Sequence, residues 1–202
     1  NRVKAAPIYV TMDHLEDGTA WGVVANSGNA NACCPMSHEN AEAMCTFAAK
    51  ATGREAADFV VCSTGVIGQT INIQAIQTGL PKAAAALNAD GSDAAATAIM
   101  TTDTVKKEIA VSFELGGREI KIGAIAKGSG MIHPNMGTML AFITTDCAIT
   151  TDLLSEVLHE VTAVTFNRVT VDGDTSTNDT CVVLANGMAG NELIEWKDEG
   201  YE

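Results

Sequence analysis

Alternating apolar positions mark a hairpin in the middle of the chain. Apolar side chains occupy every second position over 109–115 and again over 120–124, and Gly116-Gly117 separates the two runs. Successive side chains of a strand point to opposite faces of a sheet, and glycine pairs suit the tight turns that join antiparallel strands. The pattern therefore predicts a β-hairpin whose second strand leads to Lys127.

Helical spacing, with apolar residues three and four positions apart, predicts four helices. Three of them open with a serine or threonine, residue types that cap helix N-termini by accepting backbone N–H groups. The predicted helices are 37–50 capped by Ser37 and followed by Gly53, 71–88 with an interruption near Gly79-Leu80-Pro81, 92–100 capped by Ser92, and one that begins at Thr151. The apolar residues that we expect this last, amphipathic helix to turn toward the core are Leu153, Leu154, Val157, Leu158 and Val161.

Short apolar runs bounded by turn-forming residues predict the other strands. These strands cover 5–12, 20–26, 58–62, 139–143, 167–172 and 180–185. The first two are expected to pair through the polar turn at 16–18, and the tail at 191–202 has the pattern of a helix start. Strands interleaved with helices in this way predict an α/β fold.

Composition narrows the class of protein. The chain has 202 residues, of which 47% are hydrophobic, enough for one substantial core or two small domains. Its formal net charge is −13 and it has no run of Lys or Arg, which argues against nucleic-acid binding. No apolar stretch approaches the ~18 residues of a membrane span, and the first residues do not open a signal peptide. We therefore expect a cytoplasmic protein without a membrane partner.

The six cysteines show neither a C-x-x-C pair nor zinc-ligand spacing with histidine. Buried free thiols in a reducing compartment are the expectation that follows. Asp172 and Asp174 suggest a calcium loop, but the nearby glycine comes too early for an EF-hand and no glutamate closes the loop. We therefore predict no metal site.

Two glycine-containing segments have the composition of binding loops. The strand over 58–62 passes into Ser63-Thr64-Gly65-Val66-Ile67-Gly68, where outward backbone N–H groups could hold an anion or oxyanion. An ordinary turn between a strand and a helix is the alternative. The loop at 26–31 is dense in Asn and Ser side chains, which bond to nearby backbone groups in tight loops.

A stretch from Lys127 to Asp146 joins a glycine-rich loop to a buried strand. Gly128, Gly130 and Gly137 mark irregular backbone, and Thr138 directly precedes the apolar run over 139–143. A threonine at the entrance of a buried strand has an exposed backbone that could take part in a reaction. Threonine is also a common strand residue, so an ordinary strand position is the alternative.

Three motifs, AKGSGMIHPNMGTMLAF, VCSTGVIG and VDGDTSTNDT, together resemble the ornithine acetyltransferase family in their order and spacing. These enzymes are bifunctional glutamate N-acetyltransferases of arginine biosynthesis. The resemblance implies a layered α-β-β-α-type sandwich. It also implies self-cleavage between Gly137 and Thr138, so that 1–137 matches the family's first (α) chain and 138–202 the start of its second (β) chain. Many members have alanine where Gly137 stands, and glycine leaves the attacked carbonyl less hindered.

The resemblance also implies individual roles. Thr138 matches the nucleophile, whose freed α-amine would act as its base, and Thr64 and Gly65 match the oxyanion pair. Lys127 and Thr101 match substrate-binding residues, and Thr138 itself also contacts the substrate. An N-terminal threonine suits this chemistry because its α-amine has a reference pKa of about 7.7–8.0, close to what a general base needs at neutral pH.

The implied reaction is ping-pong acyl transfer from N2-acetyl-ornithine to glutamate through an acetyl-threonine. It needs no cofactor, in agreement with the missing phosphate-loop and dinucleotide motifs. Some members also use acetyl-CoA as the donor, and the residues do not decide this point. The implied assembly is a heterotetramer of two α and two β chains, with the second chain cut from the same precursor.

Two other functions stay open at this level. An N-terminal-nucleophile amidase or aminopeptidase would share the cleavage and oxyanion chemistry but pass the acyl group to water. A catalytically silent fragment is the other alternative, because the C-terminal half of the family's site is missing.

Overall fold

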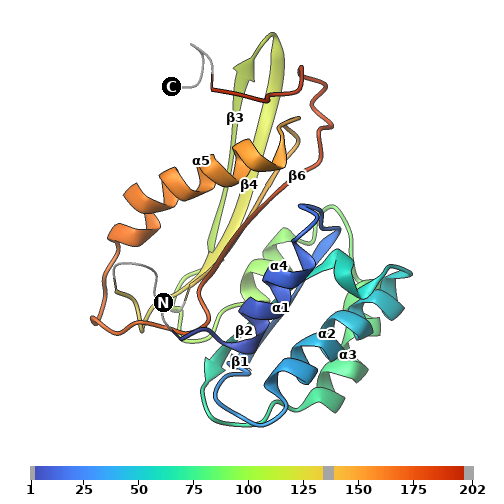
Figure 1. Ribbon diagram of the computed structural model, residues 1–202, viewed down its shortest axis with the longest axis vertical. Coiled ribbons are helices and arrows are strands. Elements are labelled where there is room, and N and C mark those ends of the chain that lie inside the picture. The colour runs from blue at the N-terminus through green and yellow to red at the C-terminus, as the bar shows by residue number, and fades with distance from the viewer. Residues whose placement is uncertain (1–2, 134–138, 198–202) are drawn as a thin grey trace.

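The computed structural model describes residues 3–133 and 139–197, which form a mixed α/β fold (Figure 1). Its α-helices are α1 (Ala6–His14), α2 (Ser37–Thr52), α3 (Ile73–Ala85), α4 (Ser92–Ala98) and α5 (Thr151–Val164). Its strands are β1 (Gly22–Asn29), β2 (Phe59–Val66), β3 (Lys107–Leu115), β4 (Arg118–Lys127), β5 (Leu140–Thr145) and β6 (Thr180–Ala185). Short 3₁₀ turns cover Ala56–Asp58 and Phe166–Arg168. The predicted α/β class is confirmed.

The strands form two sheets. β1 and β2 pair in parallel, and the second sheet has the order β3-β4-β5-β6. The predicted hairpin is confirmed, because β3 and β4 pair antiparallel around Gly116-Gly117. β5 pairs antiparallel with β4 and parallel with β6, so that Leu140 lies opposite both Lys127 and Thr180. Strands from both sides of residues 134–138 thus belong to one sheet.

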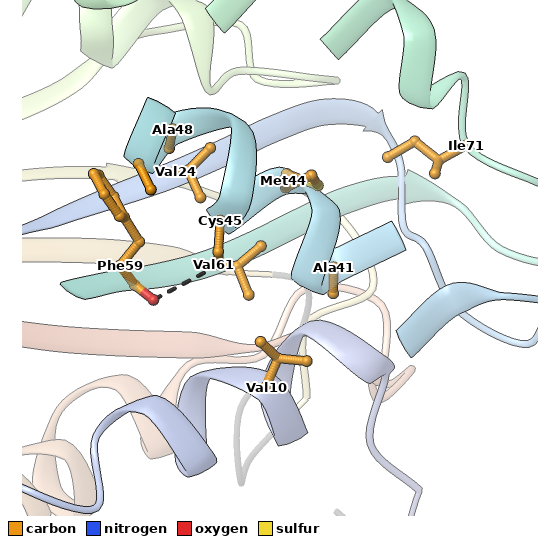
Figure 2. Packing of buried hydrophobic residues seen from close by; sticks show 10 residues of the cluster. Val10, Val24, Ala41, Met44, Cys45, Ala48, Phe59, Val61 and Ile71 are labelled. Carbon is orange, nitrogen blue, oxygen red and sulfur yellow. Dashed lines mark hydrogen bonds between the residues drawn. The ribbon is translucent and has the colours of Figure 1, made fainter. Parts of the chain in front are cut away.

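Side-chain alternation along β2 divides its residues between two cores. Val60 and Cys62 pack against Leu140 of the four-stranded sheet. Phe59 and Val61 point the opposite way, into a core with α1 and α2 (Figure 2). Figure 1 shows α5 beside the four-stranded sheet, on the side away from those helices. The layers therefore run helix, sheet, sheet, helix, and the implied α-β-β-α arrangement is confirmed.

The first element is a helix, so the predicted strand over 5–12 is wrong. Its buried residues Ala6, Pro7, Val10 and Thr11 follow a helical spacing, and proline is favoured in the first helical turn. The Thr11 hydroxyl donates to the carbonyl of Val61 at 2.9 Å and accepts from the Val61 N–H at 3.0 Å. α1 thus covers the edge of β2 that β1 leaves unpaired.

Other predicted elements differ in extent. The strand predicted over 58–62 continues to Val66, and no strand forms over 167–172, where only Phe166–Arg168 make a short turn. α3 runs through Pro81 without the expected interruption. Residues 191–197 contain no helix; Ile194 instead makes an isolated bridge to Ile149.

The predicted helix caps are wrong, and the predicted core-facing side of α5 is only partly buried. Ser37, Ser92 and Thr151 are the first helical residues, and the caps before them make no side-chain hydrogen bond to the helix. Along α5, Leu153 is buried, whereas Val161 is 47% exposed. The apolar face of α5 is therefore only partly covered by the described residues.

All six cysteines are free thiols, as predicted. Cys45, Cys62 and Cys147 are buried, whereas Cys33 is exposed, so burial is confirmed for only part of the set. Burial raises the pKa of Cys62 to about 12, which keeps it a thiol at neutral pH. Among the described helices, none is long and apolar enough to span a membrane.

Candidate active site

Thr64 lies near the end of β2, inside the strand and not in the turn that the sequence predicted. Alternation puts its side chain on the face shared by Val60 and Cys62, which is directed at the four-stranded sheet. Its hydroxyl is fully buried and has no hydrogen-bond partner among the described residues. A buried hydroxyl is normally bonded, so this oxygen is available for a ligand.

The next residue, Gly65, has a backbone that only glycine tolerates. Its φ is +134°, and a Cβ built there would lie 2.1 Å from the carbonyl carbon of Gly28 on β1. At the paired residues Gly28 and Gly65 there is therefore no room for a side chain, and this is where the oxyanion pair was predicted. A larger residue would push the strands apart and move Thr64.

The predicted nucleophile Thr138 and its neighbour Gly137 lie outside the described residues. The chain is described again from Met139, whose two backbone groups are both held. Its N–H donates to Oδ1 of Asp179 at 3.0 Å, and its carbonyl accepts from the Thr180 N–H at 3.0 Å. The residue that follows the predicted nucleophile is thus fixed by the 171–180 segment.

The 171–180 segment also reaches β2. The Asn178 amide donates to the carbonyls of Ala30 at 2.7 Å and Ser63 at 2.8 Å. Ser63 directly precedes Thr64, so adjacent side chains at 178 and 179 connect the end of β2 with the start of β5. Both residues belong to the VDGDTSTNDT motif, but the sequence analysis assigned neither of them a role.

Asp172 anchors the approach loop, residues 128–133, which leads toward the predicted cleavage site. Its carboxylate accepts the N–H of Met131 at 2.6 Å and that of Ile132 at 2.9 Å, and these bonds lower the pKa of Asp172. The Val171 N–H also donates to the Ile132 carbonyl at 2.9 Å. The carboxylate that suggested calcium therefore binds backbone, and residues 3–133 and 139–197 contain no group of three or more metal-ligating side chains.

Lys127 ends β4 opposite Leu140, on the face that packs against β1 and β2. It is only 2% exposed, and burial lowers the pKa of its ammonium. The charges of Asp103 and Asp179 act in the opposite direction. A lysine buried between sheets, with carboxylates nearby but no ion pair among the described residues, is suited to a charged ligand group or to repelling a nearby ammonium.

The predicted substrate residue Thr101 lies in a loop that is tied to the end of β4. Asp103 accepts the Gly128 N–H at 2.8 Å and pairs with Lys107 at 2.6 Å. Burial acts to raise the pKa of Asp103, but the hydrogen bonds from Lys107, Gly128 and Thr101, together with the charge of Lys107, lower it overall. Thr101 is exposed, and its N–H donates to the other Asp103 oxygen at 3.4 Å, so Asp103 links it to Gly128, the residue after Lys127; Asp103 was not predicted.

Asp179 differs electrostatically from the other two carboxylates. Burial raises its pKa to about 7, against the lowering effects of the Met139 hydrogen bond and of Lys127. Its Oδ2 atom is buried without a hydrogen-bond partner in the described part of the chain. A carboxyl group with this pKa changes protonation state near neutral pH.

Residues from four segments line one small pocket, namely Ala30, Gly65, Ile67, Met131, Ser176 and Asn178. It therefore joins the end of β1, the 64–68 segment, the approach loop and the 171–180 segment. How Thr64 lies relative to Thr138 falls outside the described residues, so the catalytic roles stay predictions.

Comparison with protein families matches residues 1–201 to the family described as the ArgJ family. Among curated relatives, the arginine biosynthesis bifunctional protein ArgJ of Symbiobacterium thermophilum is 52% identical over 195 residues, covering 96% of this chain and 48% of the relative. ArgJ 1 of Clostridium acetobutylicum is 47% identical and covers 100% of this chain and 50% of the relative. The chain thus spans about half the length of the curated relatives it matches.

Two solved structures are similar. The Bacillus halodurans arginine biosynthesis bifunctional protein ArgJ gives a TM-score of 0.62 at 36% identity, covering 68% of this chain and 73% of that chain. An ornithine acetyltransferase from Mycobacterium tuberculosis, solved in complex with ornithine, gives 0.61 at 33% identity, covering 69% and 74%. Both support the α/β sandwich described above.

Proposed function

The chain belongs to the ArgJ family, and we propose that it supplies part of an acyltransferase that moves an acetyl group from N2-acetyl-ornithine to glutamate. Its relatives are named as bifunctional proteins of arginine biosynthesis, and a similar solved structure is an ornithine acetyltransferase with bound ornithine. Because the chain spans about half of those relatives, we assign the complete activity to a polypeptide of the relatives' length.

The observation that carries this proposal is the buried hydroxyl of Thr64, which has no hydrogen-bond partner in residues 3–133 and 139–197. A buried hydroxyl without a partner costs about 1–3 kcal/mol of stability. An oxyanion that forms during acyl transfer would accept its hydrogen bond. The same oxyanion would accept a second bond from the Gly65 N–H, and one such donor typically lowers a barrier by about 3–4 kcal/mol.

Thr138 is the proposed nucleophile. Its hydroxyl would first attack the carbonyl carbon of Gly137, and the amide would rearrange to an ester that water hydrolyses. Cleavage leaves the first chain with a carboxylate at Gly137 and frees the α-amine of Thr138. That amine can then take the proton from the Thr138 hydroxyl, because its reference pKa lies close to neutral pH.

Lys127 has the burial and position to serve this chemistry. It ends β4 opposite Leu140, two residues after Thr138 in the sequence. Its charge would either bind the substrate α-carboxylate or lower the pKa of the nearby amine by repulsion. Thr101, in the loop tied to the end of β4, would contribute a further substrate contact.

The transfer itself then has two balanced halves. Acetyl-ornithine acetylates the Thr138 oxygen, and the departing amine of ornithine takes up the proton. Glutamate attacks the acetyl-threonine and leaves with the acetyl group. One α-N-acetyl amide is broken and another is formed, so no external energy source or cofactor is required. Acetyl-CoA would enter as an alternative donor to the same threonine.

The proposed assembly follows from the cleavage. Residues 1–137 would form the first chain and 138–202 the start of the second, in a heterotetramer of two of each. The described part supports a close association of the two, because β4 from the first segment and β5 from the second share a sheet. A cytoplasmic location is expected for a biosynthetic enzyme of this kind.

Substitution of Thr138 tests the proposed nucleophile in a polypeptide of the relatives' length. Wild type should yield two chains, the second beginning Thr138-Met139-Leu140. Thr138→Ala should leave one uncut chain that cannot be acetylated, whereas Thr138→Ser should still be cut because its hydroxyl is retained. Intact mass and N-terminal sequencing measure the outcome. An uncut wild type that nevertheless transfers acetyl groups would refute the mechanism.

Thr64 and glutamate complete the test. Thr64→Val keeps the shape of the side chain but removes the hydroxyl, so kcat should fall about 100-fold or more. Ornithine release from acetyl-ornithine should rise strongly when glutamate is added. An equal rate without glutamate would indicate an amidase that uses water instead. An inactive 202-residue chain beside an active polypeptide of the relatives' length would show that this chain alone is a silent fragment.

A further inference from the structure

Two adjacent side chains connect the strands that carry the proposed oxyanion pair and the proposed nucleophile. Asn178 donates to the Ser63 carbonyl at 2.8 Å, and Asp179 accepts the Met139 N–H at 3.0 Å. We propose that Asn178 and Asp179 are positioning residues that set the separation between the end of β2 and the start of β5. This inference rests on the function proposed above and deepens it.

The two contacts hold peptide groups that border the reacting residues. A peptide unit is planar, so fixing the Ser63 carbonyl also fixes the direction in which the chain enters Thr64. The Met139 N–H belongs to the peptide unit that joins it covalently to Thr138. Because residues 178 and 179 are neighbours, the span between the two peptide groups is short and has few rotatable bonds.

Asn178 is itself held by several hydrogen bonds, so it can fix the position of the groups that it contacts. It is only 2% exposed, and its amide nitrogen donates to both the Ala30 and Ser63 carbonyls. Its side-chain oxygen accepts from the Thr177 hydroxyl at 2.6 Å. Every polar group of this side chain is therefore used, and only an amide provides two donors here.

Asp179 has a different chemical requirement. One of its oxygens accepts the Met139 N–H, while the other is buried and has no partner among the described residues. The link to Met139 thus needs an acceptor and does not need a negative charge. Asparagine can supply that acceptor, whereas alanine cannot.

The test compares variants of the polypeptide that reaches the relatives' length. Asn178→Asp removes both donors at constant size, Asp179→Ala removes the acceptor, and Asp179→Asn keeps it. Misplacement of reacting groups by an ångström can be very costly, so Asn178→Asp and Asp179→Ala should slow self-cleavage about tenfold or more. These two substitutions should lower kcat of the cut enzyme by a similar factor, while KM stays within about threefold of wild type. For Asp179→Asn, the rate of self-cleavage and kcat should both stay within about threefold of wild type.

Controls separate positioning from general stability. Asn186 is exposed and directly follows the last residue of β6, at the end of the strand away from Asp179. The Asn186→Asp variant should therefore cleave as wild type does. Cleavage is measured well below the thermal unfolding temperature of each variant, determined on the uncut Thr138→Ala background. If Asn178→Asp does not fold, the Asp179→Ala and Asp179→Asn pair decides alone.

Three outcomes would overturn the inference. Cleavage and kcat of Asp179→Ala at wild-type values would show that the contact positions nothing. Asp179→Asn as impaired as Asp179→Ala would show that the charge matters and the acceptor does not. A wild type that neither cleaves nor transfers would refute the proposed function and this inference with it, whereas active wild type beside equally active variants would refute the inference only.

Discussion

Two carboxylates in one segment show how strongly surroundings decide the chemistry of a single residue. Asp172 accepts two backbone N–H groups and its pKa is lowered, whereas burial raises the pKa of Asp179 to about 7. The first is an ionised anchor for the approach loop. The second exchanges its proton near neutral pH, beside the peptide that follows the proposed nucleophile.

The stability of Asp179→Asn relative to wild type should increase as pH rises from about 4 to about 7. The ordinary pKa of the carboxyl is 3.8 and the folded-state pKa is about 7, so the folded protein binds more protons between these values. Stability of wild type therefore falls as pH rises through that window, and the loss levels off above about pH 7. Asparagine does not ionise and avoids the loss.

Thermal unfolding of both proteins between pH 4 and pH 8 measures this difference. Asp90→Asn, in an exposed turn, controls for the removal of one negative charge. A difference between wild type and Asp179→Asn that stays constant with pH would contradict the assigned protonation.

Single residues were predictable only where local sequence carries the signal. Thr64, Gly65 and Lys127 stand in recognisable motifs, and the structure brings their segments together. Asn178 and Asp179 also stand in a motif, but their contacts were not predicted because their partners lie far away in sequence: Asn178 reaches Ser63, 115 residues earlier. No periodicity or spacing records a contact over that distance.

At the scale of elements, local pairing was predictable and burial against distant elements was not. The β3–β4 hairpin follows from alternation and a two-residue turn alone. In α1, β-branched Ile8, Val10 and Thr11 suggested a strand, but the Thr11 contact with β2 and burial at helical spacing favour a helix. Residues 167–172 have strand composition, yet no neighbouring strand pairs with them in the described structure.

Thr11→Val tests the contact between α1 and β2. The substitution keeps the side-chain shape but leaves the buried N–H and carbonyl of Val61 without their partner, so the free energy of unfolding should fall by about 1–3 kcal/mol. Urea denaturation measures it. Thr97→Val in α4 is the matched control, because the Thr97 hydroxyl is exposed and bonds only within its own helix at Asp93; there the change should stay within about 0.5 kcal/mol. Equal losses would show that the edge contact is unimportant.

At the scale of the molecule, stability depends on the contact between the two sheets. Val60 and Cys62 on one side meet Leu140 and Val182 on the other, and all four are buried. The resemblance implied this layering, but hydrophobic patterning alone could not give it, because patterns identify an apolar face without naming what covers it. The exposed residues Ile109, Val111 and Phe113 of β3 show the same limit.

Leu140→Ala should weaken the whole fold. Leu140 is fully buried between the sheets, so its truncation leaves a cavity and should lower the free energy of unfolding by about 2–5 kcal/mol. Leu87→Ala, at a position that is 67% exposed, should change it by no more than about 0.5 kcal/mol. Denaturant titration of the three proteins compares them. A loss at Leu140 no larger than that at Leu87 would mean that the sheets do not depend on each other.

The Thr64 hydroxyl, which no side chain or backbone group in the described part of the chain satisfies, has a consequence for protein engineering. Valine has the same shape and leaves no buried donor unsatisfied, so Thr64→Val removes a destabilising group from the resting protein. A laboratory selection for heat resistance would therefore enrich this substitution, while the proposed oxyanion site would lose one of its two donors. Thermostability screens on this protein need a parallel activity assay, because at this position the two traits are selected in opposite directions.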